Sequence, residues 1–232
     1  MFFEFKLKLL YIYFAILISI HSLDNFTEYK SEINLVIQGP GNFNILSDSF
    51  YLNPSNIIIN GDIKPSCNKS YYLGNMLNNV TIKFDKQLES LENMFKDLNN
   101  IIEIDLSKLD TSKATTMASM FENCSNLKNI TFGNINTSLV KNMYALFHYC
   151  SKLTALDLSN FDTSSVTDMN SIFRYCESLT SIDVSKFNTS KVETMHDMFG
   201  YCHKLISINV SNFDTSKVKI FKGMFFLCYD LK

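Results

Sequence analysis

The strongest constraint on the fold is a 26-residue sequence repeat that runs without insertion from about Gln87 to the end of the chain. Phenylalanine and cysteine keep this step in two columns, Phe95, Phe121, Phe147, Phe173, Phe199 and Phe225, and Cys124, Cys150, Cys176, Cys202 and Cys228. A Thr-Ser pair recurs at the same interval, beginning at Thr111. Chance does not maintain such a register, so each repeat is expected to form one unit that stacks on the next.

The repeat from Cys150 to Tyr175 shows the local structure that the pattern favours. Leu156 and Leu158 flank Asp157, and such alternation is typical of a half-buried strand. The FDTS segment that follows has side chains that form turns and cap free backbone N–H groups. Apolar residues then recur at helical spacing, at Val166, Met169, Ile172 and Phe173. The pattern therefore predicts a strand, a turn and a short helix in each repeat.

Stacked units of this kind predict an α/β leucine-rich-repeat solenoid, with a parallel sheet on the concave side and short helices on the convex side. One unit cannot bury its own apolar face, whereas neighbouring units can share a continuous core. A 26-residue period lies in the leucine-rich range and is shorter than the period of most helical-pair repeats.

The segments LDLSNFDTSSVTDMNSIFRYC and IDVSKFNTSKVETMHDMFGYC resemble the BspA-like leucine-rich repeat family, also described as the DUF285 family of surface proteins. The resemblance covers about Gln87 to Lys232 and implies a secreted or cell-surface protein that acts in adhesion and binding, without catalytic residues. The early repeats depart from the pattern, because Leu98 stands where Cys is expected, and Leu109 and Ile135 replace the Phe of FDTS. These residues remain apolar, so they should preserve the packing.

The chain before the repeats divides into two predicted segments. Residues 1–22 are typical of a secretory signal peptide, because Lys6 and Lys8 precede an apolar run from Leu9 to Ile20. A retained signal anchor is the alternative, although the run is shorter than the roughly 20 residues of a membrane span. No second run of spanning length follows, so the mature chain is expected to have no membrane span. Residues 23–86 contain strand-like segments, SEINLVIQGPGNF, NIIING and NVTIKF, and are predicted to form a small β-rich N-terminal cap.

Residues 87–232 would form the solenoid, which ends without a polar capping repeat. The chain is therefore expected to be a fragment of a longer surface protein or to associate end to end through its last repeat. In a secreted protein, Asn-x-Ser/Thr triplets would be possible acceptors of N-linked glycans. Asn25, Asn68 and Asn79 are the candidate N-glycosylation sites outside the repeats.

No residues in the sequence are predicted to be catalytic, to bind a cofactor or to bind a metal. His148, His196 and His203 show no repeated pairing with Ser, Cys or Asp, and no Cys-x-x-Cys or His pair has ligand spacing. Most of the cysteines in the repeats are expected to be buried free thiols, with disulfides as the alternative. A net charge of -2 gives no basic field, so no nucleic-acid partner is expected.

A binding face, if there is one, is predicted on the outward strand positions of the concave side. These positions are small, rich in hydroxyl groups and mildly acidic, and the candidate residues are Asp105, Thr131, Asp157, Asp183, Asn209, Ser159, Ser185 and Ser211. The alternative is that they are simply solvated strand residues, because the face lacks the aromatic and Arg anchors of binding hot spots. We expect a non-catalytic adhesion or recognition module that binds a protein or a glycan at a cell surface. A structural spacer or a receptor ectodomain fragment with no ligand of its own is the alternative.

Overall fold

The computed structural model describes residues 30–232, which form eight β-strands and, within that range, no helix. The strands are β1 (Ser31–Gln38), β2 (Gly41–Asn44), β3 (Asn56–Ile59), β4 (Asp62–Lys64), β5 (Ser70–Leu73), β6 (Leu77–Phe84), β7 (Ile101–Lys108) and β8 (Asn129–Thr131). Six of them form one sheet in the order β4-β3-β6-β1-β7-β8, and β2 pairs with β5. The predicted signal peptide lies outside the described residues.

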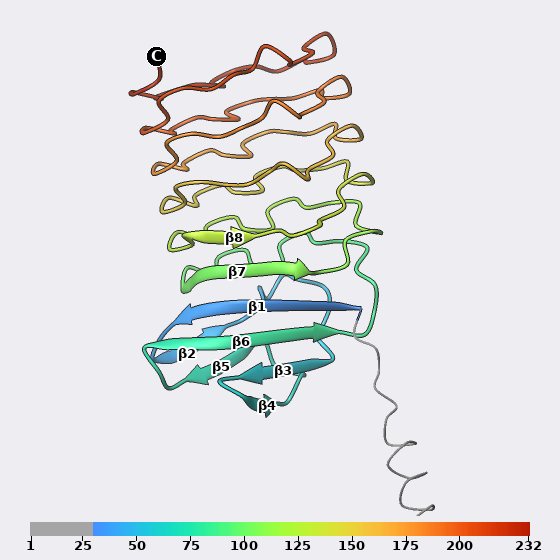
Figure 1. The fold of residues 1–232 in the computed structure, drawn as a ribbon, viewed down its shortest axis with the longest axis vertical. Helices are drawn as coiled ribbons and strands as arrows, with labels where there is room; N and C mark the ends of the chain where they lie inside the picture. Colours follow the sequence, from blue (N-terminus) through green and yellow to red (C-terminus); the bar gives the residue numbers. More distant parts are fainter. Residues whose placement is uncertain (1–29) are drawn as a thin grey trace, which may run out of the picture.

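The segment before the repeats forms strands at the three places where the alternation predicted them. In β1, the side chains of Ile33, Leu35 and Ile37 are buried while the residues between them face outward. β1 pairs antiparallel with β6 on one side and with β7 on the other. Because β7 belongs to the first repeat, the sheet continues from this segment into the repeats, as Figure 1 shows.

Each repeat forms one layer of chain, and the layers lie one above the other (Figure 1). The layers are joined by N–H groups of alternate residues, which donate to carbonyl groups of the next layer. One interface has four such bonds, from Met143 to Asp168, Ala145 to Asn170, Phe147 to Ile172 and Tyr149 to Arg174, with N···O distances of 3.0, 2.9, 2.8 and 2.9 Å. The N–H groups in between close turns within their own layer, as His148 does on Ala145 at 3.1 Å.

The prediction of an α/β leucine-rich-repeat solenoid is wrong. The described residues are all β, the main sheet is mixed, and the predicted parallel sheet is limited to β7 with β8 and isolated bridges such as Ser181 with Ser207. In the segment predicted as a helix, from Val166 to Phe173, Asp168 forms isolated bridges and turns begin only at Asn170. Its apolar residues are spaced as in a helix, but the N–H groups of Met169, Ser171 and Phe173 bond carbonyl groups of the next layer instead of closing a helix.

Two residues in every layer adopt left-handed backbone angles that an α-helix excludes. The first column is Asn93, Ser119, Ala145, Ser171, Asp197 and Gly223, with φ between 52° and 72°. The second column is Asp97, Asn123, Tyr149, Tyr175, Tyr201 and Leu227, with φ between 57° and 65°. These residues turn the chain so that alternate N–H groups point at the neighbouring layer.

Phenylalanine and cysteine fill the core at the centre of the layers. The rings of Phe95, Phe121, Phe147, Phe173, Phe199 and Phe225 stack in one column with centroids 5.3 to 5.8 Å apart. Each cysteine thiol of the repeats donates to the carbonyl of a phenylalanine one layer before, as Cys150 Sγ does to Phe121 O at 3.2 Å. Leu98 stands at the cysteine position of the first repeat, where no earlier repeat offers such a carbonyl.

Buried threonines also join the layers. Thr163 Oγ1 donates to Asn188 O at 3.0 Å and accepts from the N–H of Asn188 at 2.8 Å. Thr137 and Thr111 make the same pair of bonds one and two layers earlier. The recurring Thr of the sequence therefore satisfies one donor and one acceptor at each of these interfaces.

Large apolar side chains are exposed in the last repeat, including Ile220, Phe221 and Phe226. Association through these side chains stays a prediction. Within residues 30–232, the structure contains no helix with the length and apolar character of a membrane span.

The left-handed positions give a test of the layer geometry. Ala145 (φ 53°) and Ala114, which has no positive φ, are both fully buried, so changing each to Gly removes the same methyl group. A left-handed Ala costs about 1–2 kcal/mol, and Gly does not bear this cost. Ala145→Gly should therefore be more stable than Ala114→Gly by about 1 kcal/mol, measured by urea unfolding. Equal losses in the two variants would contradict the left-handed assignment.

Candidate functional site

The outward side chains of β6, β1, β7 and β8 form a polar face. Cross-strand pairing aligns them in two rows, Thr81, Asn34, Asp105 and Thr131 in the first, and Asn79, Val36, Glu103 and Asn129 in the second. Each row crosses from the N-terminal segment into the first two repeats. Residues far apart in the sequence therefore meet on one surface.

A hollow of about 290 Å³ lies in this face and is called here the junction hollow. The two rows line it, together with the buried residues Leu35, Val80 and Ile104 of the same strands. Thr81 Oγ1 donates to Asn34 Oδ1 at 2.7 Å, and Asn129 Nδ2 donates to Glu103 Oε1 at 3.2 Å. These bonds orient the amide and carboxylate groups around the hollow.

A second hollow of about 430 Å³ adjoins the first, because Thr131 lines both. Phe132, Gly133, Asp157 and Asn160 are among its other lining residues. The structure thus brings Asp105, Thr131 and Asp157 of the predicted binding face to one region. The remaining predicted residues are exposed and line neither hollow: Asp183, Asn209, Ser159, Ser185 and Ser211.

The predicted Asp and Ser columns also have a structural use. Asp157 Oδ1 accepts from the N–H of Ser159 at 3.0 Å, and Asp183 accepts from Ser185 in the same way at 2.9 Å. Asn209 repeats this turn with Ser211. Hydrogen bonding by Ser159 holds the pKa of Asp157 below its ordinary value. The columns therefore recur because the turn recurs, whether or not the face binds anything.

Sequence reasoning missed Asn34, Asn79 and Thr81 as lining residues. Their alternation marks them as outward-facing, but only the strand order places them beside Asp105. Asn79, predicted as an N-glycosylation site, is exposed and lines the junction hollow. Asn68 is exposed on a loop, and Asn25 lies outside the described residues.

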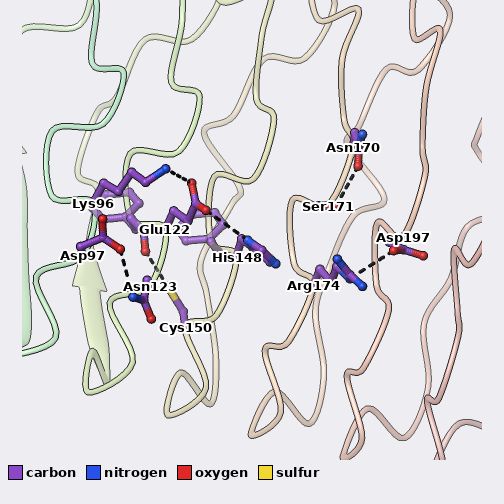
Figure 2. Close-up of polar contacts among 12 residues, drawn as sticks. Lys96, Asp97, Glu122, Asn123, His148, Cys150, Asn170, Ser171, Arg174 and Asp197 are labelled. Carbon is purple, nitrogen blue, oxygen red and sulfur yellow. Dashed lines mark hydrogen bonds and ion pairs between the residues drawn. The ribbon is translucent and has the colours of Figure 1, made fainter. Parts of the chain in front are cut away.

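A column of charged side chains crosses another part of the layers (Figure 2). Lys96 Nζ lies 2.9 Å from Glu122 Oε2, and His148 Nδ1 lies 3.5 Å from Glu122 Oε1. One layer further, Arg174 Nε lies 3.1 Å from Asp197 Oδ2. Burial opposes the ionisation of Glu122, but hydrogen bonds from Ser119 and Lys96 outweigh it and lower its pKa. Burial lowers the pKa of His148, so its ring is neutral near pH 7.

Tyrosines stack beside this column, and the sequence reasoning did not single them out. Tyr149, Tyr175 and Tyr201 have successive ring centroids 4.1 Å apart. The guanidinium of Arg174 lies over the rings of Tyr175 and Tyr201, at 5.0 and 5.4 Å. The signal was the Tyr that directly precedes Cys in three successive repeats. The stacked rings cover one another's faces, so their main contribution is packing between layers.

The cysteines of the repeats are free, as predicted, and Cys67 before the repeats is free and exposed. Cys124, Cys150, Cys176 and Cys202 are fully buried, and Cys228 is half-buried. Burial raises the pKa of Cys150 well above its ordinary value, which makes its thiol a poor nucleophile. Within residues 30–232, no group of three His, Cys, Asp or Glu side chains is placed to hold a metal ion.

The fold and the polar face define a class, an all-β protein of stacked 26-residue repeats with a hollowed polar sheet face. A family model described as a Mycoplasma protein of unknown function, DUF285, matches residues 89–181 and 153–232. These matches span well over half of the chain, which belongs to this family. Neither the curated proteins nor the solved structures gave a match to the chain.

The charged column predicts a pH dependence of stability. Folding lowers the pKa of His148. The contribution of its neutral ring to the stability of the fold is therefore complete above the ordinary His pKa of about 6.5 and is lost progressively as the pH falls below that value. The equivalent position three repeats after His148 is Phe226, so His148→Phe places a residue that the repeat already accepts there. This variant should show a smaller fall in melting temperature between about pH 7 and pH 5 than the unmodified protein. His203→Phe is the control. An unchanged pH slope in His148→Phe would show that another group is responsible.

The Asp turns predict a difference between two substitutions. Asp157→Asn keeps an acceptor for the Ser159 N–H, as Asn209 does naturally, whereas Asp157→Ala removes it. At pH 7 the melting temperature should fall in Asp157→Ala and stay near that of the unmodified protein in Asp157→Asn. Since the bond favours the ionised carboxylate, the wild-type advantage over Ala should diminish as pH falls through the lowered Asp157 pKa. An equal loss in both variants at pH 7 would contradict this explanation.

Proposed function

We propose that this protein is a BspA-like, non-catalytic adhesion or recognition module that is secreted or displayed at a cell surface. The observation that carries the proposal is the pair of adjoining hollows on the polar face. Their lining combines carboxylate, amide and hydroxyl groups, on paired strands in the junction hollow and mostly on turns and loops in the second, which suits a partner that offers several hydrogen bonds.

The surroundings of the hollows support binding rather than catalysis. Asp105 and Glu103 lie on one strand with no His, Cys, Lys or Arg among the lining residues of the junction hollow. The buried thiols and His148 belong to other parts of the layers. A protein or glycan at a cell surface is therefore the proposed partner.

A structural spacer with no ligand of its own is the second candidate. It is favoured by Asp183, Asn209 and their Ser partners, which form turns and line neither hollow. On this alternative, the polar face would be a solvated surface whose side chains serve only the turns.

The purified full chain should be tested on immobilised glycans and on immobilised fibrous matrix proteins. Thr131→Arg places a bulky cation at the exposed residue that lines both hollows, and Ser165→Arg adds the same side chain at a turn outside them. We expect binding to one of these panels, at least about tenfold weaker in Thr131→Arg and unchanged in Ser165→Arg. No binding to either panel, or equal loss in both variants, would favour the spacer.

A further inference from the structure

We propose that the junction hollow binds the ring of a neutral saccharide through neighbouring hydroxyl groups. This inference rests on the proposed recognition function and names the ligand class for one part of the polar face. It assigns the site to residues of the N-terminal segment and the first two repeats together, rather than to the repeats alone.

The hydrogen-bonding groups of the hollow match hydroxyls, which both donate and accept. Glu103 Oε1 accepts from Asn129 at 3.2 Å, and Asp105 Oδ1 accepts from the N–H of Ser107 at 2.9 Å. Among residues 30–232, no side chain or N–H group donates to the second oxygen of either carboxylate. These two oxygens can accept from ligand hydroxyls, while amide groups of the lining asparagines can donate to them.

The middle of the hollow has an apolar residue between polar ones. Val36 pairs with Asn79 on one side and with Glu103 on the other. A sugar ring has C–H groups on its faces and hydroxyls at its rim. Its face can therefore lie over Val36 while its hydroxyls reach the carboxylate and amide groups around it.

The charge and composition of the lining argue against anionic ligands and against most protein partners. Two carboxylates with no cationic side chain in the lining repel an anionic ligand. The nearby Lys83 and Lys108 are directed to Glu32, at 3.3 and 2.8 Å. The lining has no Trp, Tyr or Arg, the residues that anchor most protein interfaces. A neutral polyhydroxy ligand fits the carboxylate, amide and hydroxyl groups of this lining, and the test below separates it from a cationic one.

Paired strands and side-chain hydrogen bonds already form the site without a ligand. Its residues lie on four paired strands, and side-chain bonds already fix Asn34, Thr81, Glu103 and Asn129. A ligand therefore orders few side chains on binding, which lowers the entropic cost of association.

The test uses the full chain and solution saccharides, with calorimetry and saturation-transfer NMR. The probes are glucose, galactose, mannose and N-acetylglucosamine, with glucuronic acid as the anionic and glucosamine as the cationic comparison. The double variant Glu103→Gln with Asp105→Asn keeps acceptors for Asn129 and Ser107 but removes both charges. The control, Asp157→Asn with Asp183→Asn, changes the same charge outside the junction hollow and keeps both turns.

We expect at least one neutral sugar to bind, at least tenfold more weakly in the first variant and equally well in the control, with melting temperatures close to wild type. Equal weakening in both variants would place the sugar elsewhere on the face and overturn the inference, while leaving recognition intact. Tighter binding of glucosamine than of every neutral sugar would assign a cationic ligand instead. Binding to a matrix protein without any sugar binding would also overturn the inference alone, whereas binding to nothing would overturn the proposed function with it.

Discussion

The structure depends on backbone hydrogen bonds between equivalent parts of neighbouring layers. Four alternate N–H groups in one layer bond the next, and the residues between them close turns within their own layer. Each such bond contributes a net stability of about 0.5–1.5 kcal/mol, so the row at one interface matters more than any single contact. The stacked Phe rings and the hydrogen bonds of the buried threonines, such as Thr163 with Asn188, join the same pairs of layers. An insertion in one repeat would shift all three features together, which explains why the sequence keeps a strict period.

The sequence was sufficient for the repeat, the buried columns and three of the six strands of the N-terminal segment. The prediction of helices failed because consecutive turns and a helix place apolar residues at similar intervals. The difference lies in the partner of each N–H group, and that partner is in another layer, as for Ala145 and Asn170. The left-handed backbone angles of Ser171 and Tyr175 could not be predicted from residue type, since neither residue is Gly, Asn or Asp. Contacts between layers therefore decided the local structure.

The candidate site was predicted only in part, for a related reason. Asp105, Thr131 and Asp157 were found by their columns and do line the two hollows. Asn34 and Asn79 could not be placed, because β1 lies between β6 and β7 although the chain reaches β2 to β5 before β6. The recurrence of Asp and Ser was ambiguous evidence, since the same residues form a turn in each layer. A column in a repeat protein indicates a common structural need before it indicates a ligand.

Departures from the repeat are more informative about a binding site than its regular positions. Identical layers present the same surface each time, whereas a hollow for one ligand requires a local difference. Gly133 stands in a column otherwise occupied by Ser, and a Cβ atom there would lie 2.7 Å from the Cα of Ser107. Gly133 lines the second hollow, and Thr131 two residues earlier lines both. The N-terminal segment adds non-repeating side chains at the same end of the stack. The departures from the repeat and the side chains of the N-terminal segment meet at the first two repeats. A binding site for a specific ligand is therefore expected there rather than along the regular repeats.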